Sequence, residues 1–109
     1  MKLFQRLFLL AVLLSGFLQS AINDSADISG SGNVTQISTS PNTVANWVTF
    51  FAPSGNSGTA RFGDSTTTAS RGGQLPPGSS FTTPLGTYPL SGTYVYVANG
   101  DSLTVFWGN

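Results

Sequence analysis

Hydrophobic residues are most concentrated near the C-terminus, where residues 93–107 have the sequence TYVYVANGDSLTVFW. Two runs rich in Tyr, Val, Phe and Trp flank the turn-forming segment 99–101 (Asn-Gly-Asp), and this arrangement predicts a β-hairpin. Because side chains alternate between the faces of a strand, a two-residue or four-residue loop places the larger aromatic set on one face. We predict that this face lies in the core. It consists of Tyr94, Tyr96, Ala98, Leu103, Val105 and Trp107.

The opposite face of the predicted hairpin is also apolar. It holds Val95, Val97, Ser102, Thr104 and Phe106. Large apolar side chains are not expected to face water together, so either a second sheet or a second subunit should cover them. We therefore predict Val95, Val97 and Phe106 as interface contacts, and we expect the protein to form a homo-oligomer.

A second strong strand is predicted over residues 43–51 (TVANWVTFF), because apolar residues occupy both of its faces. Its β-branched and aromatic residues, and Pro53 just beyond it, argue against the alternative of a helix. Elsewhere, short apolar segments alternate with turn signals that recur about every ten residues. The predicted fold class is all-β: a small antiparallel β-sandwich or barrel of about six to eight short strands, spanning residues 34–109.

The N-terminal segment, residues 1–21, has the layout of a secretory signal peptide with a signal helix. Lys2 and Arg6 precede the apolar run 7–14, and Ala21 is a small residue at the expected cleavage point. The apolar run is shorter than the ~20 residues that a membrane span needs. We expect a secreted, periplasmic or extracellular protein with no membrane attachment after cleavage. The alternative is a retained membrane anchor.

Residues 22–33 (INDSADISGSGN) are predicted to form a flexible linker, because Gly and Ser are frequent in this segment. The alternative interpretation is an arm that docks on another subunit.

Composition narrows the possible functions. Of the 109 residues, 39% are hydrophobic and only 7% are charged, which favours strands joined by turns over surface helices. Beyond residue 21 the chain has two arginines and four aspartates, a net charge of −2, so it has no basic patch for nucleic acid. Without cysteine, stability must come from the core or from assembly with other copies.

Catalytic chemistry has few candidate residues. Because the chain has no His, Cys or Glu, it has no Ser-His or Cys-His pair and no zinc site built on these residues. Asp64 and Asp101 lie in predicted turns, where an aspartate accepts backbone N–H groups. Calcium binding by these carboxylates and loop carbonyls is the alternative. We predict no catalytic residue, no metal, no cofactor and no enzymatic activity.

Several aromatic residues are candidates for a sugar-stacking platform: Trp47, Tyr88, Tyr94, Tyr96, Phe106 and Trp107. Burial in the core is the alternative for those in strands. Tyr88 lies in a predicted loop, so we predict it as a ligand contact. The corresponding alternative function is a secreted carbohydrate-binding module whose partner is a cell-surface glycan.

The order of turns from Ala60 to Trp107 resembles a small β-sandwich domain of bacteriophage virion structural proteins. In that pattern a Gly-Asp-Ser turn precedes a strand ending at Gly, then Leu-x-Pro-Gly-x-Ser and a final Tyr-Val hairpin. The matching residues here are Gly63, Asp64, Ser65, Gly72, Leu75, Pro77, Gly78, Ser80, Leu90, Tyr94, Val95, Asp101 and Val105. The resemblance implies a non-enzymatic fibre, decoration or tail-associated component whose partners are other virion or surface proteins.

Overall fold

The computed structural model describes residues 24–109, so the predicted signal peptide lies outside the described residues. Ten strands and one short 3₁₀ helix follow each other in this part of the chain. The strands are β1 (Asp24–Ser29), β2 (Val34–Gln36), β3 (Val44–Ala45), β4 (Trp47–Phe51), β5 (Ala60–Gly63), β6 (Gly73–Leu75), β7 (Ser80–Thr82), β8 (Tyr88–Pro89), β9 (Tyr94–Tyr96) and β10 (Ser102–Gly108), with η1 (Leu90–Gly92) before β9.

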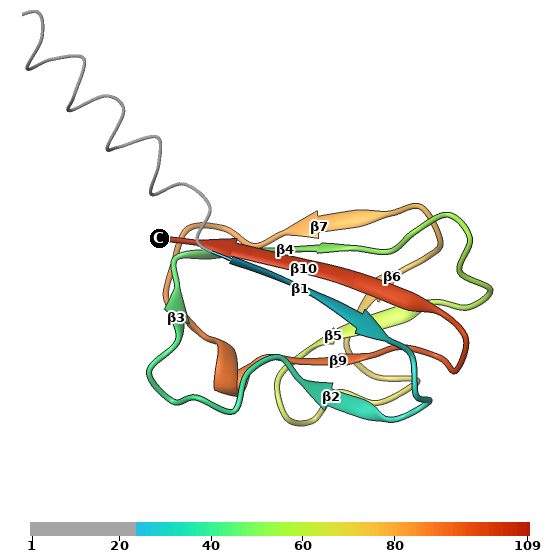
Figure 1. Ribbon diagram of the computed structural model, residues 1–109, viewed down its shortest axis with the longest axis horizontal. Coiled ribbons are helices and arrows are strands. Elements are labelled where there is room, and N and C mark those ends of the chain that lie inside the picture. Colours follow the sequence, from blue (N-terminus) through green and yellow to red (C-terminus); the bar gives the residue numbers. More distant parts are fainter. Residues whose placement is uncertain (1–23) are drawn as a thin grey trace, which may run out of the picture.

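Eight of these strands form two antiparallel four-stranded sheets that pack face to face (Figure 1). Sheet A has the order β1-β10-β4-β7, and sheet B has the order β2-β9-β5-β6. Among the eight, the first strand pairs with the last, the second with the seventh, the third with the sixth and the fourth with the fifth. This nested pairing is the topology of a jelly roll. The all-β sandwich prediction is confirmed, and β3 and β8 add a separate two-stranded ladder.

The connections divide the sandwich into two different ends. At one end, which we call the crossover end, the segments 30–33, 52–59, 76–79 and 97–101 all pass from one sheet to the other. At the opposite end, which we call the β3–β8 end, lie the segments 37–46 and 83–93, which include β3, β8 and η1. Figure 1 shows the two ends on opposite sides of the ribbon.

The predicted hairpin between residues 93 and 107 is wrong. A turn forms where it was expected, because Asp101 N–H donates to the Ala98 carbonyl (3.0 Å) and Gly100 has φ of +87°. Asn99, however, has negative φ, whereas the type I′ turn that suits a tight hairpin needs positive φ at both central residues. Beyond this turn the chain passes to the other sheet, and β9 and β10 face each other across the core instead of pairing.

This crossing changes which side chains are buried. In β10 the prediction is confirmed, since Leu103, Val105 and Trp107 are in the core. In β9 it is reversed: Val95 is fully buried, while Tyr94 and Tyr96 are half-buried on the outer side. The alternation within each strand was correct, but the faces of the two strands do not belong to one sheet.

The flexible linker predicted for residues 22–33 is wrong over residues 24–29, which form β1 and pair along β10. Ala26 lies opposite Val105 and Ile28 opposite Leu103, so both apolar side chains of β1 pack on the core. The period-two spacing of Ala26 and Ile28 was the signal for this strand. This pairing also gives hydrogen-bond partners to the backbone N–H and C=O groups of β10 on the side away from β4.

The core lies between the sheets and is formed by alternating residues of β4 and β10 in sheet A, and of β5, β6 and β9 in sheet B. A row of stacked rings extends the core toward the edge strand β7. Phe62 stacks on Phe50, with ring centroids 4.7 Å apart, and on Phe81, at 4.9 Å. The ring of Phe62 lies directly over Gly73, its partner on β6, where a side chain would overlap it.

Candidate functional site

Asp101 closes the crossover end. Its side chain accepts hydrogen bonds from the backbone N–H groups of Ser57 (2.8 Å) and Gly58 (2.9 Å), and from the Ser57 hydroxyl (3.0 Å). The two backbone hydrogen bonds are the main reason that the pKa of Asp101 is lowered from its usual 3.8. An aspartate in a turn was expected to accept backbone N–H groups, but these donors come from a distant loop.

At the same end, the side chain of Asn56 hydrogen-bonds to the backbone of Ser102. Its side-chain amide donates to the Ser102 carbonyl (2.7 Å) and accepts from the Ser102 N–H (2.9 Å), as a neighbouring strand would. Both Asn56 and Asp101 are buried. Asp64 is different: it caps its own exposed turn by accepting from the Thr66 N–H (2.8 Å) and hydroxyl, and these bonds lower its pKa.

The outer side of sheet A has an apolar surface that we call the aromatic face, formed by Trp47, Phe51 and Phe106. Trp47 and Phe51 alternate with core residues along β4, and Phe106 lies between two core residues of β10. Phe51 is 41% exposed, and Trp47 and Phe106 are half-buried in an edge-to-face pair with centroids 6.2 Å apart.

Threonine hydroxyl groups lie within the aromatic face and beside it. Thr49 lies between Trp47 and Phe51 on β4, and its hydroxyl is 2.8 Å from that of Thr82 on β7. Thr104 lies opposite Phe51, and its hydroxyl donates to Asp27 (2.9 Å) at the edge of the sheet. The strands β4, β7 and β10 contain no charged residue.

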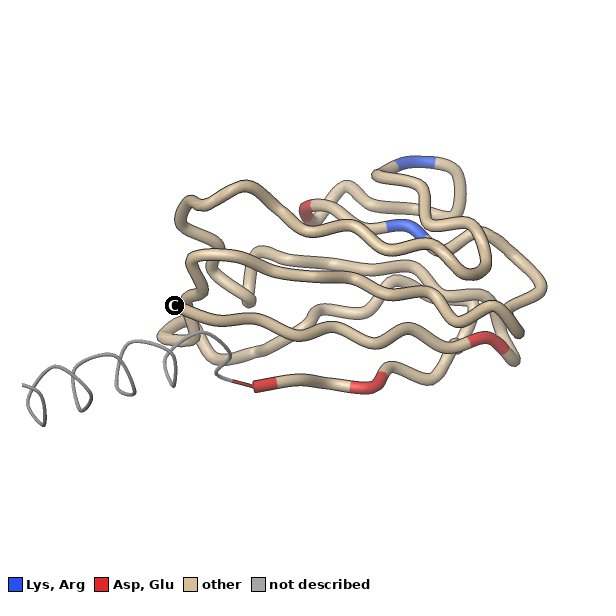
Figure 2. The backbone as a smooth tube through the Cα atoms, turned by 90° about the horizontal axis from the view of Figure 1, so that it is seen from above, with Lys and Arg blue, Asp and Glu red and all other residues tan. Residues whose placement is uncertain are grey.

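The outer side of sheet B is more polar. Tyr94, Tyr96 and Arg61 lie there, and an Arg61 Nη group donates to the Gly72 carbonyl (3.2 Å). Gln36 and Gln74 complete this surface, each opposite one of these residues. Figure 2 shows both basic positions on one side of the molecule and the acidic positions of β1 on the other.

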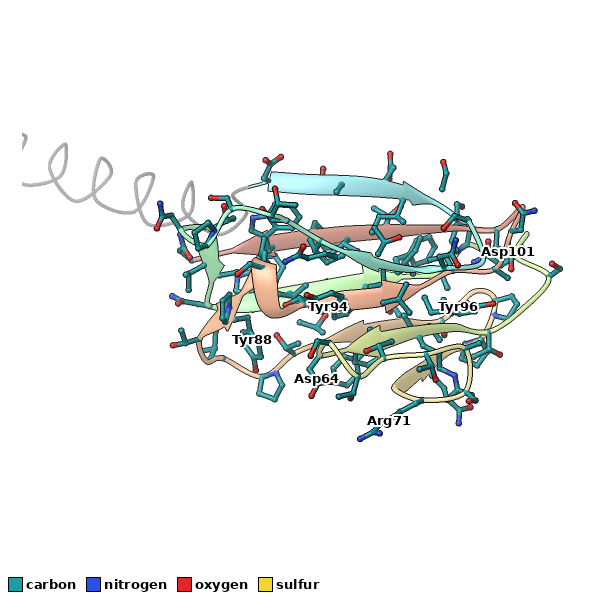
Figure 3. The ribbon with its side chains drawn as sticks, turned by 90° about the horizontal axis from the view of Figure 1, so that it is seen from below. Asp64, Arg71, Tyr88, Tyr94, Tyr96 and Asp101 are labelled. Atoms are coloured by element: carbon teal, nitrogen blue, oxygen red, sulfur yellow. The ribbon has the colours of Figure 1, made fainter. Side chains whose placement is uncertain are left out.

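A pocket of about 290 Å³ opens between the sheets near the β3–β8 end. Val48 and Phe50 of β4 and Phe62 of β5 form its inner walls, and Tyr88, Pro89 and Thr93 form its outer part. Figure 3 shows Tyr88 and Asp101 at opposite ends of the sandwich. The pocket exists because β5 and β7 end at Gly63 and Thr82, before the sheets reach this end.

The four predicted contact residues do not form one site. Phe106 belongs to the aromatic face, and Tyr88 lines the pocket. Val95 and Val97 are 0% and 2% exposed, so the folded domain does not present them to a partner. The opposite sheet covers them, which was one of the two predicted alternatives, a second sheet or a second subunit. The role of Phe51 was missed, although its alternation with Phe50 was a usable signal.

No protein-family model, no curated protein sequence and no solved structure matched this chain. The resemblance to bacteriophage virion domains therefore stays a prediction from the sequence. In residues 24–109 no helix has the length and hydropathy that crossing a membrane requires.

Proposed function

We propose that this protein is an exported, non-enzymatic structural or adhesive module that assembles with copies of itself, as a virion-like or surface subunit. The aromatic face is the observation that supports this proposal most. Trp47, Phe51 and Phe106 lie together on the outer side of one sheet, where covering them would remove apolar surface from water. Tryptophan and phenylalanine are enriched in the centres of protein interfaces.

The charge distribution favours a second copy as the occupant of this face. A protein with net negative charge repels its own copies wherever acidic surfaces meet. The centre of the aromatic face is uncharged, and the nearest acidic residues, Asp24 and Asp27, lie on the edge strand β1. Two copies related by a twofold axis can therefore meet over β4 and β10 without opposing like charges.

Light scattering and sedimentation velocity over a concentration series test this proposal. The wild-type protein is expected to form a dimer or larger assembly, and the double variant Trp47→Ser/Phe106→Ser is expected to weaken association at least about 100-fold. The matched control is Tyr94→Ser/Tyr96→Ser, which removes two half-buried aromatics from the other outer face and should leave association intact. A wild-type protein that stays monomeric at all concentrations contradicts the proposal.

Export has its own test, because it depends on the sequence of residues 1–21 alone. When the gene is expressed in a secreting host, the intact mass of the released protein should correspond to residues 22–109. A released protein that retains Met1 contradicts cleavage.

Binding of a glycan is the second candidate function. At the aromatic face, one hydroxyl hydrogen of the Thr49–Thr82 pair remains to donate, and the oxygen of Thr104, which lies opposite Phe51, remains to accept. Aromatic rings beside such groups bind sugars by stacking and hydrogen bonding. A glycan array distinguishes the two functions: a specific sugar whose binding is lost in Trp47→Ser supports a carbohydrate-binding module, and an array without binders excludes it.

A further inference from the structure

Apolar side chains form most of the wall of the pocket near the β3–β8 end, and its three hydroxyl groups each make one hydrogen bond to the backbone. The Tyr88 hydroxyl donates to the Pro84 carbonyl (2.7 Å), and the Thr93 hydroxyl donates to the Pro89 carbonyl (3.0 Å). The Thr83 hydroxyl oxygen accepts from the Val48 N–H (2.9 Å). Each of these hydroxyls already makes one hydrogen bond and the other side chains between them are apolar, so a charged ligand would lose its hydration without gaining an opposite charge.

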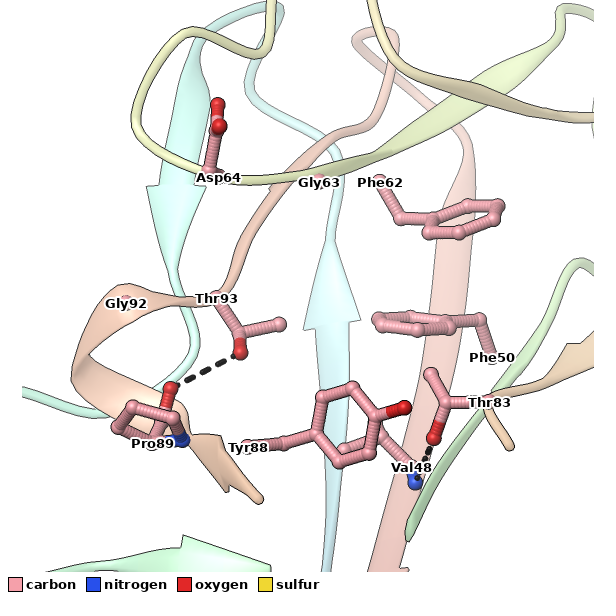
Figure 4. A pocket seen from close by; sticks show the side chains of 10 residues that line it. All are labelled: Val48, Phe50, Phe62, Gly63, Asp64, Thr83, Tyr88, Pro89, Gly92 and Thr93. Carbon is pink, nitrogen blue, oxygen red and sulfur yellow. Dashed lines mark hydrogen bonds between the residues drawn. The ribbon is translucent and has the colours of Figure 1, made fainter. Parts of the chain in front are cut away.

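The charged group nearest the pocket, the Asp64 carboxylate, points away from it. Asp64 is the one charged residue among the described residues that line it, and its carboxylate accepts from Thr66 in its own turn. Figure 4 shows the Asp64 side chain pointing away from the rings of Phe50, Phe62 and Tyr88. The space between the rings is therefore suited to a neutral molecule.

The flat walls indicate the shape of that molecule. Phe50 and Phe62 stack nearly parallel, at 20°, and the Tyr88 ring lies on the side of Phe50 that is away from Phe62 (Figure 4). Aromatic rings pack well against ring edges and faces at such spacings. In volume, the pocket is about twice an apolar cavity of roughly 150 Å³ that accepts benzene.

From the walls, charge and volume together, we infer that this pocket binds a small neutral aromatic molecule of one or two rings, held between Tyr88 and the Phe50–Phe62 stack. The site is separate from the aromatic face, which lies on the outer side of sheet A. It therefore does not depend on the proposed assembly function.

Gly92 provides a direct way to fill the pocket. It lies in the wall, its φ is not in the left-handed region, and an added Cβ would be 3.9 Å from Pro89 Cγ, an ordinary contact. Gly92→Leu is therefore expected to fold and to occupy the hollow. Gly55→Leu is the matched control, since nothing lies within 4 Å of its Cβ position and it belongs to the distant segment 52–59.

The experiment titrates the full chain with indole and follows binding by calorimetry and NMR. The wild-type protein should bind indole with a dissociation constant of roughly 0.1–1 mM, a range typical of efficient ligands of this size. Gly92→Leu should weaken binding at least tenfold, and Gly55→Leu should leave it unchanged. Glucose and benzoate should bind at least tenfold more weakly than indole.

Three results would overturn the inference: no saturable binding of indole, undiminished binding by Gly92→Leu, or glucose binding as tightly as indole. The binding position can also be tested on the wild-type protein. Bound indole should give intermolecular NOEs to the ring protons of Tyr88 and Phe62. Indole that binds without these NOEs also contradicts the site. The Trp47→Ser/Phe106→Ser variant should bind indole normally, so failure of assembly and failure of this pocket are distinguishable.

Discussion

The two ends of the sandwich differ in how the space between the sheets is filled. At the crossover end, Asp101 and Asn56 are buried and hydrogen-bonded to backbone groups of neighbouring segments. At the β3–β8 end, rings and aliphatic groups surround a hollow of about 290 Å³. The comparison indicates that the crossover end stabilises the fold, whereas the other end has space for a ligand.

The connections explain this difference. Four segments cross between the sheets at one end, and their backbone N–H and C=O groups leave the strand ladders there. Buried polar side chains replace the lost partners, as Asn56 does for Ser102. At the other end, the ladder between β3 and β8 pairs part of the backbone, so fewer polar side chains are needed inside.

The largest effect is expected from Asn56→Ala at the crossover end. The substitution leaves both the N–H and the carbonyl of Ser102 without a partner, so the free energy of unfolding should fall by about 3 kcal/mol. Urea denaturation measures this change. Asn42→Ala, at an exposed turn of the β3–β8 end, is the control and should change stability by less than about 0.5 kcal/mol. Equal losses at both positions would contradict the comparison.

Gly73→Ala should have the next largest effect. An added methyl group overlaps the Phe62 ring, which is held between Phe50 and Phe81 and has little freedom to move. We expect a loss of about 2 kcal/mol in unfolding free energy, typical of an overpacked site. Indole binding should weaken as well, since Phe62 is a wall of the pocket. Thermal and chemical denaturation test the first effect, and a stability equal to wild type would show that the stack is not rigid.

Acid should weaken the crossover end through Asp101. Its pKa is lower in the folded state than the usual 3.8, so its hydrogen bonds stabilise the protein above that value and are lost as the pH falls through the folded pKa. Unfolding free energy should therefore decrease between about pH 5 and pH 2. Asp101→Asn should show a smaller decrease over the same range. An unchanged slope in this variant would mean that other groups cause the acid sensitivity.

Gly92→Leu should have the smallest effect on stability, and its sign should be favourable. Filling the hollow and restricting the unfolded chain are each stabilising, so we expect unfolding free energy to stay equal or to rise by up to about 1 kcal/mol. Gly55→Leu restricts the unfolded chain equally but fills no pocket. A Gly92→Leu variant less stable than Gly55→Leu would indicate that the hollow is smaller than its walls suggest.

The sequence by itself determined the fold class, the place of the Asn99-Gly100 turn and the buried face of β10. These features are local, because a strand's alternation of side chains and a glycine's positive φ depend on neighbouring residues. Tyr88 was predicted in a loop but lies on the short strand β8, outside the two main sheets, where it lines the pocket, and its role as a ligand contact stays a prediction.

Only the tertiary structure decided which strands pair. Alternation assigns side chains to two faces but does not name the neighbouring strand, so Val95 and Leu103 were placed on opposite sides of one sheet instead of in two sheets that share a core. The turn at Asn99-Gly100 leads the chain from sheet B to sheet A, and the long-range pairing of β1 with β10 places a segment rich in Gly and Ser in sheet A. The aromatic face and the pocket depend on these non-local pairings, because each combines residues from strands far apart in the chain.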